Sequence, residues 1–377
     1  MFSVTRFAAA LVAVAAVLPC RAAPAPVEPP LCAVIETTLS TPFNPQGNGQ
    51  LRQAPPPDAA AVPIKQFAFD GDPKTFFASS QNPTAKDHFT LVLDKAVAVK
   101  SIDVTTGKSN DNADKLDVGS LEVSADGTTF TPADKFANGV ASAKLKGQSV
   151  KAIRIKPAAD MDHPLAIREI VIDSDPQVAV FKYPVEIFPN IEDSPEMKEW
   201  IDKCIKVCER QYRMLNEELK SDGYKPATVI TMTLKKRDRG VAETSGNRIT
   251  GTTQFFVAHP DDIGAMVHET THVVQHYRGR GSPGWLVEGL CDYVRFFKYE
   301  PAGKLGRINP QTAHYNGSYR VTAAFLNYLV LNYDKDIVQK LNTMMREGKY
   351  TEDVWVNLCG KTAQELDEEW RATLVKR

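Results

Sequence analysis

Two histidines and a glutamate in the second half of the chain have the spacing of a metal-binding helix. His268 and His272 are four residues apart, and Glu269 directly follows the first of them. On an α-helix, residues four apart lie on one face about 6 Å apart along the axis, so both imidazoles can bind one metal ion. Glu269 is turned by about 100° from His268, which keeps it off the metal but close to a water there. This pattern predicts a zinc site that activates water for hydrolysis.

The residues around this motif favour a helix. Asp261 and Asp262 follow Pro260, as expected at a helix N-terminus. A surface helix that carries two histidines by coincidence is the competing interpretation. It is disfavoured because apolar residues recur at helical spacing on both sides of the motif, at Ile263, Met266, Val267, Val273 and Val274.

A catalytic zinc site needs a third protein ligand and one open position. Glu288 follows His272 by sixteen residues, in an apolar, helix-like segment at 284–293. We expect Glu288 to supply a carboxylate oxygen from this second helix. Asp292, one turn later, is placed to accept the spare N–H of a ligating histidine, in particular His268. An ordinary exposed helix edge is disfavoured, because two carboxylates in an apolar stretch are costly unless they are paired or ligating.

The second half of the chain contains a series of distinctive motifs. They lie at 241–247, 268–275, 286–289, 292–295, 319–326, 338–342 and 358–361. On these motifs, the segment at 183–377 resembles the plant basic secretory protein family, which is similar to the gluzincin zinc peptidases. The resemblance implies a zincin-like α+β domain with a catalytic Zn²⁺ and a proteolytic role. Val274 and His276 stand where the plant sequences tend to carry tryptophan, so we carry no substrate preference across.

The expected reaction is hydrolysis of a protein or peptide substrate. Glu269 would act as general base on a metal-activated water and then pass the proton to the departing amine. The oxyanion needs a donor besides the metal, and Tyr319 is the candidate because many gluzincins place a tyrosine at the start of a downstream helix. Tyr315 is the alternative donor, and a purely structural tyrosine is an equally open interpretation. An extended substrate could also pair with an edge strand at 244–251.

A rival interpretation comes from another class of protein. The chain could be a non-catalytic adhesion or binding protein built on a metalloprotease-like domain. The intact Glu269 argues against this alternative, because a protein without turnover has no need of a general base.

Composition and charge limit the partners. The chain has 377 residues, of which 43% are hydrophobic and 24% are charged, which is globular and long enough for two domains. Lys and Arg number 45 against 46 Asp and Glu, so the net charge is −1. No global positive field is available to hold nucleic acid or an anionic membrane. The short basic stretch at 235–239 is interrupted by Asp238 and is best explained as a solvated loop.

The first half of the chain has a different periodicity. Between 31 and 175, short runs alternate apolar and polar residues with a period of two and are separated by turn residues. This pattern predicts an antiparallel β jelly-roll sandwich, followed from 183 to 377 by a mainly helical domain. The clearest runs lie at 88–93, 101–105, 120–124 and 152–156.

Three motifs stand out in the β half, at 69–77, 121–127 and 167–170. On these motifs, it resembles the discoidin, or coagulation-factor C-type, domains and the related carbohydrate-binding modules. The resemblance implies a structural Ca²⁺, with a plain tight turn and a surface carboxylate as the alternative. All tyrosines and tryptophans lie at 183 or later, so we favour a spacer or protein-contact role over a glycan or cell-surface contact. Hard oxygen ligands suit calcium, and the implied ones are Asp70, Asp72, Thr75 and Glu169.

The N-terminus predicts export. Arg6 precedes twelve apolar residues at 7–18, and small residues follow, which is the build of a signal peptide over 1–22. A Pro-rich spacer at 23–30 comes next. Twelve apolar residues are too few to span a bilayer, and no later segment is long and apolar enough, so we expect a secreted or periplasmic protein with no transmembrane segment. A lipid anchor at Cys20 is the alternative.

Three cysteines in the second half are expected to be inert. Cys204 and Cys208 are four residues apart in a helical pattern, and Cys291 lies inside the apolar segment that carries Glu288. Buried thiols of this kind behave as small apolar side chains.

Overall fold

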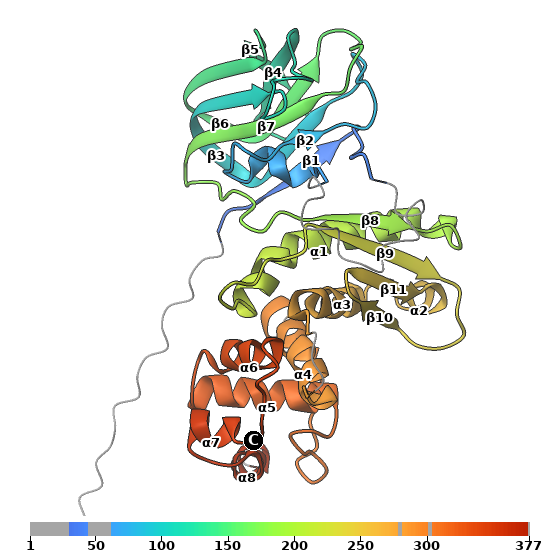
Figure 1. The fold of residues 1–377 in the computed structure, drawn as a ribbon, viewed down its shortest axis with the longest axis vertical. Coiled ribbons are helices and arrows are strands. Elements are labelled where there is room, and N and C mark those ends of the chain that lie inside the picture. Colours follow the sequence, from blue (N-terminus) through green and yellow to red (C-terminus); the bar gives the residue numbers. More distant parts are fainter. Residues whose placement is uncertain (1–29, 44–61, 278–280, 301–303, 376–377) are drawn as a thin grey trace, which may run out of the picture. The chain divides into compact units, whose positions relative to one another are not determined.

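An antiparallel β-sandwich and a mixed α/β domain follow one another along the chain (Figure 1). The structure, a computed structural model, describes residues 30–43, 62–277, 281–300 and 304–375. Each domain has its own cluster of buried apolar side chains. The predicted multidomain architecture is therefore confirmed.

Seven strands build the sandwich, and the sheet order is β2-β7-β3-β6-β4-β5, with β1 paired to β3. All of these pairings are antiparallel. A short 3-10 helix, η1 at Lys65–Phe69, precedes β2. The strands are β1 Ala33–Thr37, β2 Phe77–Ala78, β3 Phe89–Thr106, β4 Gly119–Ser124, β5 Thr131–Lys135, β6 Val140–Pro157 and β7 Ala166–Asp175.

Strand β3 pairs with different neighbours along its length. Residues 89–93 pair with β1, whereas residues 98–106 pair with β7. Register shifts follow Val92 and Val99, and bulges of this kind let a strand bend. The runs at 88–93 and 101–105, expected as separate short strands, therefore belong largely to one strand. No Gly or Pro stands between them to end it.

The second domain is built on a four-stranded sheet in the order β10-β11-β9-β8. Strands β8, β9 and β11 are parallel, and β10 pairs antiparallel with β11 at the edge. The strands are β8 Glu186–Asn190, β9 Val229–Lys235, β10 Ala242–Ser245 and β11 Arg248–Thr252. The helices are η2 Pro195–Met197, α1 Lys198–Glu218, α2 Thr253–Ala258, α3 Ile263–Gln275, α4 Gly284–Val294, η3 Arg295–Tyr299, α5 Tyr319–Asn332, α6 Ile337–Arg346, α7 Val354–Cys359 and α8 Ala363–Val375.

Helix α3 lies at the centre of this domain. It contacts α1, α4, β10 and β11, and all but one of its thirteen residues are buried. Asp262 caps its N-terminus by accepting a hydrogen bond from the N–H of Ala265 at 3.2 Å. At the other end, the guanidinium of Arg346 donates to the carbonyl oxygens of Val274 and Gln275 at 2.7 and 3.2 Å. Both ends of the helix are thereby fixed.

A glycine brings α4 and α5 into close contact. A Cβ atom at Gly289 would lie only 2.1 Å from Cγ2 of Thr322, so a larger residue would push the two helices apart. Thr322 lies one turn after Tyr319, at the start of α5. This close approach sets the position of the first turn of α5 against the helix that carries Glu288.

The structure also bears on the expectations for the cysteines and for membrane-spanning segments. Cys204, Cys208 and Cys291 are buried, and no disulfide joins cysteines among the described residues. Within the same part of the chain, no helix combines the length and apolar character that crossing a bilayer requires. The predicted signal peptide at 1–22, the spacer up to residue 29 and the lipid anchor at Cys20 lie outside the described residues.

Candidate metal centre

Helices α3 and α4 bring His268, His272 and Glu288 together. Oε2 of Glu288 lies 3.1 Å from Nε2 of His268 and 3.3 Å from Nε2 of His272. The ligand atoms of a tetrahedral zinc site with bonds of 2.0–2.1 Å are about 3.3 Å apart. The two distances to Glu288 match this spacing, so the three side chains are compatible with one zinc ion.

Asp292 orients one of the two imidazoles. Its Oδ1 lies 2.8 Å from Nδ1 of His268, on the side of the ring opposite Glu288. Burial alone would lower the pKa of His268, but the hydrogen bonds to Asp292 and Glu288 outweigh it and raise the pKa to about 9. These carboxylates thus stabilise positive charge at this position, and a metal ion that binds there would replace the proton of the imidazole.

The pKa of the Glu288 carboxylate is shifted in the opposite direction, below its ordinary value. Burial acts to raise its pKa, but hydrogen bonds with His268 and His272 prevail and lower the pKa to about 2. Glu288 is therefore anionic over the whole physiological range, which is the state that a metal ligand requires.

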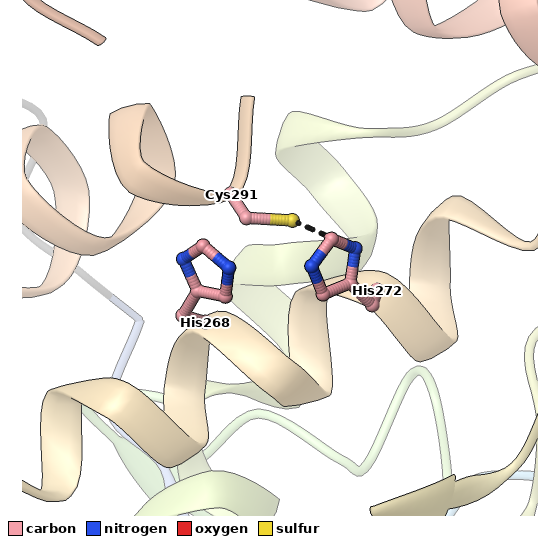
Figure 2. Close-up of side chains that lie close together, drawn as sticks. All are labelled: His268, His272 and Cys291. Atoms are coloured by element: carbon pink, nitrogen blue, oxygen red, sulfur yellow. Dashed lines mark hydrogen bonds between the residues drawn. The ribbon is translucent and has the colours of Figure 1, made fainter. Parts of the chain in front are cut away.

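Cys291 offers a different third donor, and Figure 2 shows it reaching toward His272. Ligand atoms of His268, His272 and Cys291 lie within 4.8 Å of one another. However, the Cys291 sulfur lies 3.4 Å from Nδ1 of His272, whereas the Nε2 atom on the far side of that ring faces Glu288. Burial, reinforced by the charge of Glu288, also raises the thiol pKa well above its ordinary value. The geometry favours Glu288, and Cys291 packs behind His272.

His272 is held by a residue to which the sequence assigned no role. Oε1 of Gln275 lies 2.8 Å from Nδ1 of His272, and Nε2 of Gln275 donates to the carbonyl oxygen of Val287 at 2.8 Å. Gln275 thus links the end of α3 to the residue before Glu288. Its position three residues after His272, inside the motif at 268–275, was the available signal.

Glu269 is fixed from the edge of the sheet. The hydroxyl of Thr244, on β10, donates to Oε2 of Glu269 at 2.7 Å and lies 3.0 Å from its carbonyl oxygen. Thr244 falls in the motif at 241–247, but nothing in the sequence indicated that it would contact Glu269. This contact holds the carboxylate on the pocket side of α3.

Of the two candidate tyrosines, the structure brings only Tyr319 to the pocket. Its ring is stacked against that of His268, with centroids 6.4 Å apart, and 52% of the residue is exposed. The charge of Glu288 raises the pKa of Tyr319, so its hydroxyl keeps the proton that it would donate. Tyr315 instead packs against Trp285 and Phe325 with centroids 5.0 and 5.6 Å away.

One pocket of about 850 Å³ is lined by Thr244, His268, Glu269, His272, Gln275, Glu288, Asp292 and Tyr319. Its walls are β10, α3, α4 and the first turn of α5, and His276 also lines it just beyond the end of α3. Strand β10 pairs only with β11 in the described part of the chain, so its outer edge is available beside Glu269. The arrangement can hold a metal ion, place a carboxylate beside it and accept an extended ligand.

The sandwich contains a second group of potential cation ligands. The hydroxyl oxygen of Thr75 lies 2.9 Å from Oδ2 of Asp70 and 2.8 Å from the carbonyl oxygen of Asp72, and it can donate its one proton to either. Glu169 is buried, and its Oε2 has no hydrogen-bond partner among the described residues. Burial, followed by the charge of Asp70, raises the pKa of Glu169 to about 7. An unsatisfied buried carboxylate whose pKa is raised by burial and by two aspartates has the donor type that a hard cation such as Ca²⁺ prefers.

Comparisons with known proteins address each domain separately. Residues 185–370 match the model of the BSP family, described as a peptidase of plants and bacteria, and residues 59–170 match that of the F5/8 type C domain. A comparison with curated proteins finds no significant match.

Solved structures resemble the sandwich at low sequence identity. One is the CBM32-1 module from a family 31 glycoside hydrolase of Clostridium perfringens, which is 18% identical, with a TM-score of 0.28 over 37% of this chain and 91% of that one. Another is the family 32 module of NanJ from C. perfringens in complex with galactose, which is 16% identical, with a TM-score of 0.28 over 37% and 92% of the two chains. The family models therefore relate residues 185–370 to the BSP peptidases and residues 59–170 to the discoidin-like F5/8 type C domains.

Proposed function

We propose that this protein is a zinc-dependent peptidase, with His268, His272 and Glu288 as the metal ligands. The observation that carries the proposal is the approach of both histidine Nε2 atoms to one Glu288 oxygen, at 3.1 and 3.3 Å. A zinc ion held there would polarise a peptide carbonyl and make a nearby water more acidic. The match of residues 185–370 to a peptidase family supports the same class of reaction.

The side chains around this centre then have defined tasks. Glu269, held by Thr244, accepts a proton from the attacking water and later donates it to the departing amine. Tyr319 donates a hydrogen bond to the oxyanion that forms at the carbonyl. Asp292 keeps His268 oriented with Nε2 toward Glu288, which maintains the spacing between the ligands.

The substrate is an extended protein or peptide segment. The outer edge of β10 carries unpaired backbone groups next to Glu269, and a peptide strand that pairs with them would place its carbonyls over the pocket. Backbone pairing supplies affinity without a strong demand on side chains. The export expected from residues 1–22 would place this activity outside the cytoplasm, in a secreted or periplasmic protein.

The sandwich supplies a binding contact for the peptidase. Its match to the F5/8 type C domain supports this role. A glycan or cell-surface ligand is one form of such a contact. A protein contact is the other, and it is favoured because no tyrosine or tryptophan precedes residue 183.

Cleavage assays test the proposed reaction. The purified full chain is expected to cleave casein or members of a random peptide library when it holds one zinc ion. A chelator such as 1,10-phenanthroline should abolish cleavage, and stoichiometric zinc should restore it, because water is otherwise not acidified in the pocket. A chain that binds one zinc ion but cleaves neither substrate would instead favour the non-catalytic binding protein.

We also propose that Asp70, Asp72, Thr75 and Glu169 hold a structural Ca²⁺. At about 100 times its dissociation constant, a ligand that binds only the folded state stabilises it by about 2.7 kcal/mol. For a domain of this size, that corresponds to a rise of about 5–10 °C in the melting temperature. Calorimetry of the full chain with calcium and with EGTA measures this difference.

The pH dependence of the same stability has a defined sign. The raised pKa of Glu169, about 7 against 4.5 in a free side chain, means that the folded state binds the proton more tightly than the unfolded state. Without calcium, stability is therefore greatest below about pH 4.5 and falls as the pH rises through about 7. Calcium should remove this loss of stability.

Glu169→Gln should abolish the calcium response, whereas Asp117→Asn, an exposed control on the same domain, should keep it. A calcium response that survives Glu169→Gln would contradict the site.

A further inference from the structure

Arg320 lies beside the candidate zinc centre without a role in the proposed reaction. It follows Tyr319 in the first turn of α5, and it lines the same pocket as His268 and Glu288. Its side chain is exposed to the solvent of that pocket. A ligand in the pocket can therefore reach the guanidinium.

The other charged groups of the pocket are already occupied by neighbours. Glu288 and Asp292 contact the imidazole nitrogens of His268, and Glu243 pairs with Arg237 at 2.6 Å.

The second arginine of the pocket is also paired. Arg295 contacts Asp262 at 2.5 Å and Glu300 at 3.4 Å. Arg320, in contrast, has no carboxylate partner among the described residues. Its five N–H donors are thus available to a ligand.

Two features hold a positive site at this position. The guanidinium of Arg320 lies 4.9 Å from the ring centroid of Phe296, which is buried, and such a contact restrains the planar group. In addition, the N-cap residue Ser318 makes no side-chain hydrogen bond to the first turn of α5. The N–H groups of that turn therefore receive no cap from Ser318, and the positive end of the helix dipole lies next to Arg320.

We propose that Arg320 and the first turn of α5 form a carboxylate-binding subsite, so that the preferred substrates carry an acidic group at this place. A planar guanidinium with free donors binds a carboxylate through two parallel hydrogen bonds, which an amide or an amine cannot reproduce. The carboxylate is either an Asp or Glu side chain or the free C-terminus of the substrate. The inference rests on the proposed function, because it assigns a substrate class to the same pocket.

Matched peptides test the subsite by cleavage. In one series, Glu, Gln or Lys is scanned through the positions of an otherwise neutral peptide with an amidated C-terminus. In the second series, a neutral peptide carries a free acid or an amide at its C-terminus. The best acidic peptide should have a kcat/KM about 10–100 times that of its neutral analogue, mostly through a lower KM. The series in which this preference appears identifies the source of the carboxylate.

Variants assign the preference to Arg320. Arg320→Gln should remove it, Arg320→Lys should retain part of it, and Arg320→Glu should shift the preference toward lysine peptides. Lys144→Gln, which removes one exposed positive charge from the sandwich, should leave it unchanged. A preference for acidic peptides that survives Arg320→Gln, or cleavage with no such preference, would overturn the subsite and leave the peptidase intact.

Binding separates this inference from the proposed function. Fluorescence anisotropy with labelled peptides measures affinity for the zinc-loaded Glu269→Gln chain, with and without Arg320→Gln, so it needs no turnover. If the Glu269→Gln chain binds acidic peptides selectively through Arg320 and the wild-type chain cleaves nothing, the peptidase is refuted but the subsite is supported. Equal binding of acidic and neutral peptides would refute the subsite.

Discussion

Replacing Glu269 by glutamine is expected to lower kcat by about 10²–10⁴-fold, the range that a positioned general base contributes. The amide has the size of the carboxylate and can keep a hydrogen bond to Thr244, which lies 2.7 Å from Oε2, but it cannot accept a proton from water. Glu269 is not among the proposed metal ligands, so zinc content and melting temperature should stay near those of the wild type. Steady-state kinetics on the best library peptide, with metal analysis of the same samples, measure both quantities.

A matched variant separates this effect from a general change of charge. Glu347→Gln, at the exposed end of α6, removes one carboxylate outside the pocket and should leave kcat within about twofold, because surface substitutions are usually nearly neutral. A Glu269→Gln chain that retained wild-type kcat would contradict the role of general base.

Glu288 and Cys291 should differ sharply in their effect on zinc. Removing the carboxylate in Glu288→Ala deletes one of three proposed ligands. The zinc affinity should fall by more than about 100-fold, which is the upper range for losing a residue that only hydrogen-bonds to a metal ligand. Cys291→Ser should keep zinc and activity, because the sulfur faces Nδ1 of His272 and not the side where Glu288 lies. Competition with a chromophoric chelator gives both affinities.

The opposite pattern of affinities would require a different centre. If Cys291→Ser lost zinc while Glu288→Ala retained it, the ligand set would be His268, His272 and Cys291, whose ligand atoms also lie within 4.8 Å of one another. Circular dichroism on both variants shows whether either substitution has disrupted the fold, since both residues lie on α4.

The sequence predicted the two architectures because each has a strong periodic signal. The alternation of apolar residues along 101–105 and 120–124 matches β3 and β4, where one face of each strand is buried. The length of β3 was not predicted. Its continuity depends on bulges and on pairing with β1 and β7, which come from distant parts of the sequence.

The candidate site was predictable where its residues share helical spacing. His268 and His272 lie four apart on α3, and Glu288 and Asp292 lie four apart on α4, so a contact between the two helices brings both pairs together. Thr244 and Arg320 could not be placed in this way. Their positions depend on how β10 and α5 pack against α3 and α4, and such packing leaves no periodic pattern in the sequence.

X-ray absorption at the zinc K-edge of the full chain, loaded with one equivalent of zinc, tests the central claim most directly. Bound by His268, His272 and Glu288, the metal should have only nitrogen and oxygen neighbours at about 2.0–2.2 Å, with the outer-shell scattering of two imidazoles. The same spectrum should lack a sulfur neighbour. A zinc–sulfur distance of about 2.3 Å, or the absence of imidazole scattering, would contradict the assignment.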